Sequence, residues 1–183
     1  MPRFEPDFAG VFASTPIWSK GDYELAIESV RGQAWDQVKD GHETGVVVKV
    51  VKLRPKIKGM YDSNGKLITE VDGVDIADQA AEEISLWIHS KGAMAMSKRA
   101  IMAILGYDEK EEEEFNDYLR GGNLDLSFDF EESDEGYDVT LGSGWESLAG
   151  KLVGAHLDKQ QVNIEGREPF EQQQYIRFFP AGS

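Results

Sequence analysis

Alternating hydrophobic and polar positions mark two segments near the start of the chain, and such alternation is typical of strands with one buried face. Apolar residues occupy every second position from Tyr23 to Ile27, within residues 22–30. The segment 45–58 opens with a run of valines and then carries basic residues at every second position. We expect a strand in each segment. Pro55 should mark the edge or the end of the second, because proline cannot donate a ladder hydrogen bond.

A third strand is expected within residues 66–89. Asn64 and Gly65 lie between apolar flanks, and this pair predicts a hairpin turn because both residues tolerate a positive φ. The apolar segment 84–89 then has the composition of a buried strand. This interpretation places Trp87 in the core.

The pattern changes to a helical one on either side of residue 90. Asp75 is expected to cap a short helix that runs to Glu83. A mostly apolar segment rich in alanine and methionine predicts a buried helix over 93–105. Asp108 and Glu111 have the spacing of a capping box, which predicts the start of a second helix.

Further strands are expected at 124–130, where the alternation is strict, and at 137–141, 152–158 and 174–179. A length of 183 residues fits one domain. We therefore expect an α+β, mainly β fold, as a five-stranded OB-like antiparallel barrel with helices inserted between the third and fourth strands.

Within this fold, residues 1–20 form an N-terminal arm and 21–183 form the single OB-like domain, with an acidic helical insert at about 75–121.

Charge is unevenly distributed along the chain, which has a formal net charge of −15. Residues 69–147 carry 5 basic and 21 acidic side chains, so the acidic excess is internal. By contrast, no carboxylate lies between Glu43 and Asp62, and that stretch contains a basic strip. The strip consists of Lys49, Lys52, Arg54, Lys56 and Lys58. A net negative charge argues against nucleic acid as a partner, whereas this local strip could contact phosphates.

The sequence offers little catalytic chemistry. The chain has no cysteine, which excludes disulfides and Cys-ligated metals. The three histidines, His42, His89 and His156, are far apart in sequence. Neither a Gly-x-Ser-x-Gly motif nor a phosphate-binding P-loop is present. We therefore expect no enzyme, no catalytic residue, no metal site and no cofactor. No signal peptide or membrane span is expected either, so the predicted location is the cytoplasm.

Several pieces of the chain together carry a resemblance to a known family. They are Lys20-Gly21-Asp22-Tyr23-Glu24-Leu25, the segment 93–106 ending in Ile104-Leu105-Gly106, Leu148-Ala149-Gly150-Lys151, and Gln174-Tyr175-Ile176-Arg177-Phe178-Phe179-Pro180. Over about residues 20–180 the pattern resembles small OB-fold single-stranded-DNA-binding proteins of tailed bacteriophages. The resemblance implies sequence-independent binding of single strands in phage DNA replication or recombination, with replication or recombination proteins as partners, in the host cytoplasm. Many such proteins end in an acidic tail, whereas the acidic block here is internal.

Sequence-independent binding of single strands requires aromatic faces for the bases and cations for the phosphates. The candidate DNA-binding residues are Arg31, Trp35, Lys49, Lys52, Arg54, Lys56, Lys58, Tyr61, Lys151 and Arg177. Two alternatives stay open. The acidic segment could instead make the protein an interaction module or a DNA-mimic inhibitor, and an exposed strand edge could support a homodimer.

Overall fold

The computed structural model describes residues 3–5 and 20–182, and most of the predicted arm lies outside them. The strands are β1 (Gly21–Lys39), β2 (His42–Tyr61), β3 (Leu67–Ile68), β4 (Glu70–Val71), β5 (Val74–Asp75), β6 (Ile84–Trp87), β7 (Phe128–Ser133), β8 (Gly136–Leu141), β9 (Leu152–Val162) and β10 (Phe170–Phe179). The helices are α1 (Lys91–Ile104), the 3-10 helix η2 (Glu109–Glu111), α2 (Glu112–Arg120) and α3 (Ser143–Glu146).

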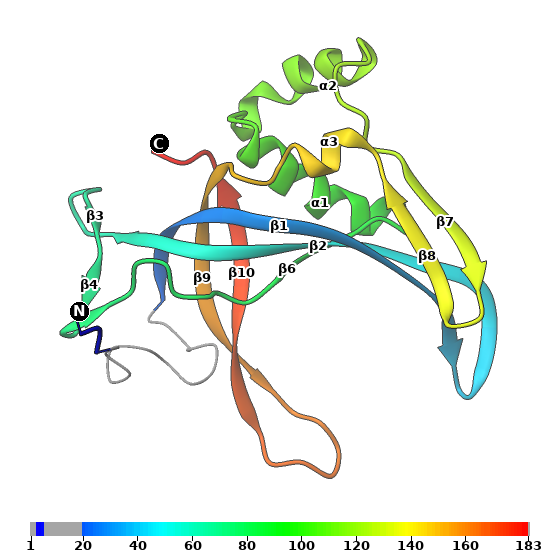
Figure 1. Cartoon of the computed structure of the whole chain (residues 1–183), viewed down its shortest axis with the longest axis horizontal. Helices are drawn as coiled ribbons and strands as arrows, with labels where there is room; N and C mark the ends of the chain where they lie inside the picture. The colour runs from blue at the N-terminus through cyan, green and yellow to red at the C-terminus, as the bar shows by residue number, and fades with distance from the viewer. Residues whose placement is uncertain (1–2, 6–19, 183) are drawn as a thin grey trace.

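The fold is α+β and mainly β, as predicted, and is built on one antiparallel sheet (Figure 1). The sheet has six strands in the order β10-β9-β1-β2-β3, and β6 also pairs with β2. The hairpins β4-β5 and β7-β8 form separate two-stranded sheets. In the described residues, no ladder joins β6 to β10, so the sheet is open and the closed barrel expected from the sequence is not formed.

Strands β1 and β2 form a hairpin much longer than the strands predicted at 22–30 and 45–58. Their two-residue turn is Asp40-Gly41, with φ values of 51° and 78°, which is the geometry of a type I′ hairpin turn. The prediction that Pro55 marks the edge or the end of the second strand is wrong. Pro55 is buried inside β2, opposite Ile27, where a bulge in β1 interrupts the regular ladder.

The main core lies between the inner face of the sheet and helix α1. Helix α1 contacts β6, β9 and β10, and Ser90 caps it by accepting a hydrogen bond from the Ala93 N–H at 3.2 Å. Tyr23, Leu25, Ile57, Leu86, Ile101, Trp145 and Val153 are among the core residues. The helix predicted at 93–105 and the capping box at Asp108 are both confirmed.

The β7-β8 hairpin packs on β1 around Gly32, in the half of the strand that ends at Lys39. It covers the face of β1 that also faces the core. A Cβ on Gly32 would lie 2.5 Å from Val139 Cγ1 and 2.9 Å from Leu141 Cδ2, so only glycine permits this close approach without a shift. Nearby, the Tyr137 hydroxyl donates a 2.7 Å hydrogen bond to the Asp36 carboxylate. In this part of β1 and β2, one face of the sheet is therefore covered by the hairpin and the other face is open.

The open edges of β6 and β10 are connected by side chains instead of a ladder. The Glu82 N–H donates to the Gln173 side-chain oxygen at 3.0 Å, and the Tyr175 hydroxyl donates to the Glu82 carbonyl. Burial raises the pKa of Tyr175 above its ordinary value. We call this junction, made by Glu82, Gln173 and Tyr175, the seam.

One predicted element is absent, and another begins later than predicted. Residues 75–83 form no helix, because the Asp75 carboxylate accepts a hydrogen bond from the Ala77 N–H and stabilises a turn. The strand expected at 124–130 begins only at Phe128, since the Asp125 carboxylate and carbonyl bond to Ser127 and to Gly144 at the start of α3.

The predicted acidic helical insert also divides into two parts. Helix α1 has no acidic residue, and it separates the carboxylates at 75–83 from those of η2 and α2. No helix within residues 20–182 combines the length and the apolar character needed to span a bilayer.

Candidate nucleic-acid interface

The register of β1, β2 and β6 assigns the basic strip to one face of the sheet. Lys52 lies opposite Arg31 on β1 and opposite Ser85 on β6, and directly paired residues share a face. Along β2 the basic positions from Lys52 to Lys58 alternate with buried residues of the inner face. We define the outer face by Arg31, Gln33, Trp35, Val48, Val50, Lys52, Arg54, Lys56, Lys58, Ser85 and Trp87.

Carboxylates neutralise part of this outer face. The Arg31 guanidinium bonds Glu83 through two nitrogens, with Nη2–Oε1 at 3.0 Å and Nε–Oε2 at 3.3 Å. The Lys56 ammonium lies 3.1 Å from a Glu28 oxygen. Because these partners come from elsewhere in the chain, the cation run in the sequence overstates the positive charge available on the surface.

The same holds for Lys58, whose ammonium lies 3.2 Å from Asp78 Oδ1. Lys52 and Arg54 differ, since neither has an ion pair with any residue that the structure describes. Arg54 is exposed and Lys52 is half-buried. These two cations are the ones best placed to receive an anionic ligand.

Two tryptophans extend the outer face beyond the cations. Trp35 and Trp87 retain 41% and 38% of their exposure, and their ring centroids lie 5.8 Å apart in an edge-to-face arrangement. His89 adds a third ring, 6.0 Å from that of Trp87. Val48 and Val50, the cross-strand neighbours of the tryptophans, are buried but lie outside the main core cluster. The tryptophans thus cover a small apolar patch and keep part of each ring accessible.

The prediction that Trp87 belongs to the core is therefore wrong. Ser85 and Trp87 lie on the outer face, whereas Ile84 and Leu86 on the same strand are buried in the core. Strict alternation along residues 84–89 could have revealed this division, but the high overall apolar content concealed it.

Lys49 does not belong to the outer face. Its odd position in β2 turns it to the side covered by β7, where its ammonium lies 5.0 Å from the centre of the Phe130 ring. This is cation–π geometry, so Lys49 helps to hold the β7-β8 hairpin and is not placed for phosphate contact beside Lys52.

The Tyr61 side chain contacts β1 and the C-terminal segment. Its hydroxyl donates a 3.1 Å hydrogen bond to Glu24 and accepts one from the Gly182 N–H at 3.1 Å. Burial first, and then the nearby carboxylates of Glu24 and Asp22, raise the pKa of Tyr61. Its ring lies 6.2 Å from that of Phe179. Tyr61 therefore lies apart from the tryptophans.

Lys151 and Arg177 are also separated from Lys52 and Arg54. Lys151 is exposed at the start of β9, where its carbonyl accepts a hydrogen bond from the Ile27 N–H. Arg177 lies on β10, which is separated from β2 in the sheet order by two strands, β9 and β1. Its guanidinium lies 5.4 Å from the centre of the Phe179 ring.

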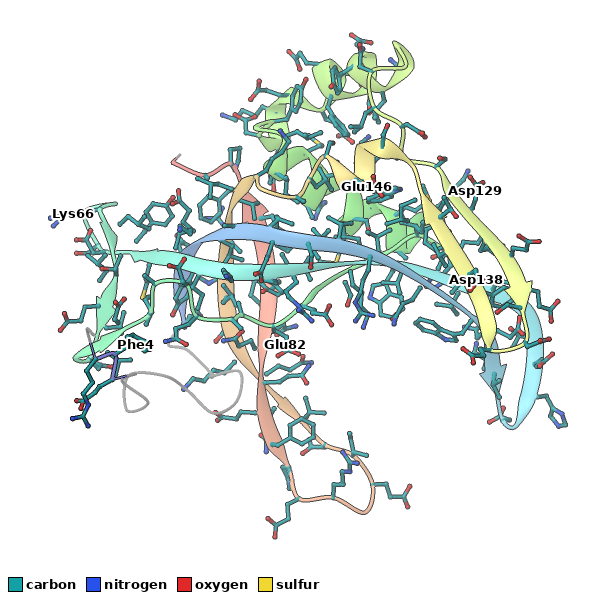
Figure 2. All side chains as sticks on the ribbon, viewed as in Figure 1. Phe4, Lys66, Glu82, Asp129, Asp138 and Glu146 are labelled. Carbon is teal, nitrogen blue, oxygen red and sulfur yellow. The ribbon has the colours of Figure 1, made fainter. Side chains whose placement is uncertain are left out.

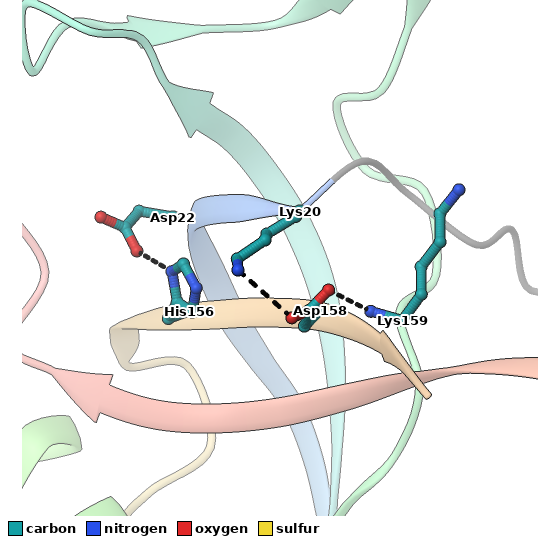
Figure 3. Close-up of polar contacts among 5 residues, drawn as sticks. All are labelled: Lys20, Asp22, His156, Asp158 and Lys159. Atoms are coloured by element: carbon teal, nitrogen blue, oxygen red, sulfur yellow. Dashed lines mark hydrogen bonds and ion pairs between the residues drawn. The ribbon is translucent and has the colours of Figure 1, made fainter. Parts of the chain in front are cut away.

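Charge pairs join the start of β1 to β9, the strand that lies between β1 and β10 (Figure 3). His156 Nδ1 lies 2.7 Å from Asp22 Oδ1, and the Lys20 ammonium lies 3.5 Å from Asp158. A backbone hydrogen bond from Lys159, and then the charge of Lys20, lower the pKa of the Asp158 carboxyl. This paired region does not continue the positive surface.

Most of the acidic residues lie away from the outer face. Asp129 and Asp138 lie on the β7-β8 hairpin, and Glu146 lies in α3 (Figure 2). This hairpin packs on the inner side of β1, so its carboxylates and the exposed cations are divided by the sheet. The two kinds of charge are therefore separated in space only in part, because Glu28, Asp78 and Glu83 lie close to cations of the outer face.

The sequence matches neither a known protein-family model nor a curated protein, so the geometry of the outer face supplies the basis for a functional assignment.

Proposed function

We propose that the protein binds single-stranded DNA through the outer face of β1, β2 and β6. The observation that carries the proposal is the half-exposed Trp35–Trp87 pair on the same face as Lys52 and Arg54, two cations without a carboxylate partner among the described residues. An aromatic platform next to cations is the combination that single strands require, since bases stack and phosphates need neutralisation.

Stacking on one aromatic side chain contributes roughly 1–3 kcal/mol per base and tolerates any sequence, because every base has a π face. The net charge of −15 repels DNA at long range. Attraction by Lys52 and Arg54 acts within about one Debye length, roughly 8 Å at physiological salt. We therefore expect modest affinity that falls steeply as salt is added.

An OB-like interpretation of the sheet supports this assignment. Strands β6, β2, β1, β9 and β10 are consecutive neighbours, and the helices α1 and α2 lie between β6 and β9 in the chain. In OB folds the face of the second and third strands binds oligonucleotides, and β2 and β6 would take those places. A role in phage replication or recombination, with proteins of those processes as partners, follows from the sequence resemblance alone.

The test is a fluorescence anisotropy titration of a labelled oligothymidylate. Trp35→Ala and Trp87→Ala should each weaken binding by about 5- to 150-fold, in line with the loss of one stacked base. Phe170→Ala is the matched control, because Phe170 is a similarly exposed aromatic, at 39%, on the distant end of β10. Absence of binding by the parent at low salt, or equal losses in the control, would refute the proposal.

A second candidate function is binding of a basic protein through the acidic surface of η2, α2 and β7-β8. Of the many carboxylates in this described region, ion pairs are formed by Glu112, with Lys98, and by Asp117, with Arg120. The others remain available to a cationic partner. This function predicts that the protein binds a basic protein and has no affinity for oligonucleotides.

A further inference from the structure

A cleft of about 680 Å³ lies between α1, the start of η2 and α2, and the end of β10. None of the residues that line it belongs to β1, β2 or β6, so it is separate from the outer face. Its volume falls within the range of roughly 300–1,000 Å³ that is usual for small-ligand sites. Its apolar lining includes Met102, Tyr107, Phe178, Phe179 and Pro180, and its basic lining consists of Lys98, Arg99, Lys110 and Arg177.

The cations of this cleft are largely unneutralised. Lys98 pairs with Glu112 at 2.8 Å, but Arg99, Lys110 and Arg177 form no ion pair with a described residue. These three come from three different elements, α1, η2 and β10. In a chain with a net charge of −15, three such cations around one cavity indicate an anionic ligand.

Three carboxylates also line the cleft, and two of them are already engaged. Glu112 holds Lys98, and the Asp108 carboxylate accepts a 2.8 Å hydrogen bond from the Lys110 N–H as part of the capping box. Glu109 is the remaining one. A backbone hydrogen bond leaves the negative charge of Asp108 in place. Arg99, Lys110 and Arg177 therefore face two carboxylate charges, those of Asp108 and Glu109, and the positive charge still exceeds the negative charge by one.

We propose that this cleft binds a nucleoside phosphate, with the phosphate among Arg99, Lys110 and Arg177 and the base against the aromatic lining. Three cations from separate elements suit one compact, multiply charged group, and arginine forms bidentate bonds with phosphate. Aromatic side chains offer flat surfaces to a base. An acidic peptide would spread its charge along a chain and would gain less from three cations at one cavity. The ligand can be a free nucleotide or the phosphorylated end of a strand.

Isothermal titration calorimetry with thymidine 5′-monophosphate, thymidine and inorganic phosphate tests this site. The nucleotide should bind at least about tenfold more tightly than either fragment, because both halves of the site contribute. The combined variant Arg99→Gln, Lys110→Gln, Arg177→Gln should weaken nucleotide binding by at least about tenfold, since hydrogen bonds to charged groups are among the strongest. The control is Lys39→Gln, Lys91→Gln, Lys159→Gln, which removes the same charge from exposed positions outside the cleft.

The same titration separates this site from the outer face. The Trp87→Ala variant should retain nucleotide binding, whereas the triple cleft variant should retain binding of an oligothymidylate that lacks a 5′ phosphate. A gain in oligonucleotide affinity from a 5′ phosphate, lost in the triple variant, identifies the strand end as the source, and equal affinities identify the free nucleotide. The proposal is overturned if the nucleotide gives no heat, if phosphate alone binds as tightly, if the control loses as much, or if a hexaglutamate peptide binds more tightly.

Discussion

The two unpaired cations of the outer face should control how salt weakens DNA binding. The variant Lys52→Gln, Arg54→Gln removes both of them. Each phosphate neutralised on a single strand contributes about −0.7 to the slope of log K against log salt concentration, so loss of two contacts should make the slope shallower by about 1.4. Between about 50 and 200 mM salt, the parent should therefore lose about sevenfold more affinity than the variant.

The matched comparison is Lys56→Gln, Lys58→Gln, which changes the net charge by the same amount. These lysines lie 3.1 Å from Glu28 and 3.2 Å from Asp78. An ammonium held by a carboxylate does not replace a counterion on DNA, so this variant should change the slope by less than about 0.5.

Anisotropy titrations of a labelled oligothymidylate at four salt concentrations give both slopes. If the two variants flatten the slope equally, net charge alone governs binding, and the distinction between paired and unpaired cations fails. An unchanged slope in Lys52→Gln, Arg54→Gln would remove these residues from the interface.

Three further predictions follow from contacts described above. Glu83→Gln should release Arg31, so DNA affinity should rise and the salt slope should steepen by about 0.7, and a weaker or unchanged complex would contradict this. Tyr175→Phe removes the donor to the Glu82 carbonyl and should lower the free energy of unfolding by about 1–2 kcal/mol in urea denaturation, whereas no loss would deny the seam a stabilising role. Burial raises the pKa of Tyr23 from 10.0 to about 12. Its stabilising contribution should be complete below pH 10 and lost as pH rises toward 12, and Tyr23→Phe should show a weaker dependence of the urea midpoint in that window.

Local patterns in the sequence predicted much of the sheet. Alternation located β2, although not its full length, and the same alternation separates Lys49 from Lys52 because their positions differ in parity. The length of β1 was underestimated because its outer half is mostly polar. The Asp40-Gly41 turn is nevertheless a recognisable hairpin signal that would have extended both strands.

Long-range pairing explains what the sequence could not predict. Arg31 and Glu83 are 52 residues apart, and only the pairing of β6 with β2 brings them together. The free or neutralised state of each cation depends on such contacts, so a basic run in the sequence does not define a basic surface. The helix predicted to begin at Asp75 is absent for a local reason, since an aspartate carboxylate stabilises a turn as readily as it caps a helix.

The seam leaves β6 anchored by a ladder along one edge only, since β2 pairs with it and β10 reaches its neighbour Glu82 through the Gln173 and Tyr175 side chains. A strand with a backbone ladder on one edge opens locally at a lower free-energy cost than a strand with ladders on both edges. Trp87 lies on β6, so an oligonucleotide stacked on its ring should make local opening of this strand less frequent. Slower amide hydrogen exchange along 84–87 would then report that an oligonucleotide is bound, independently of its contacts with the cations.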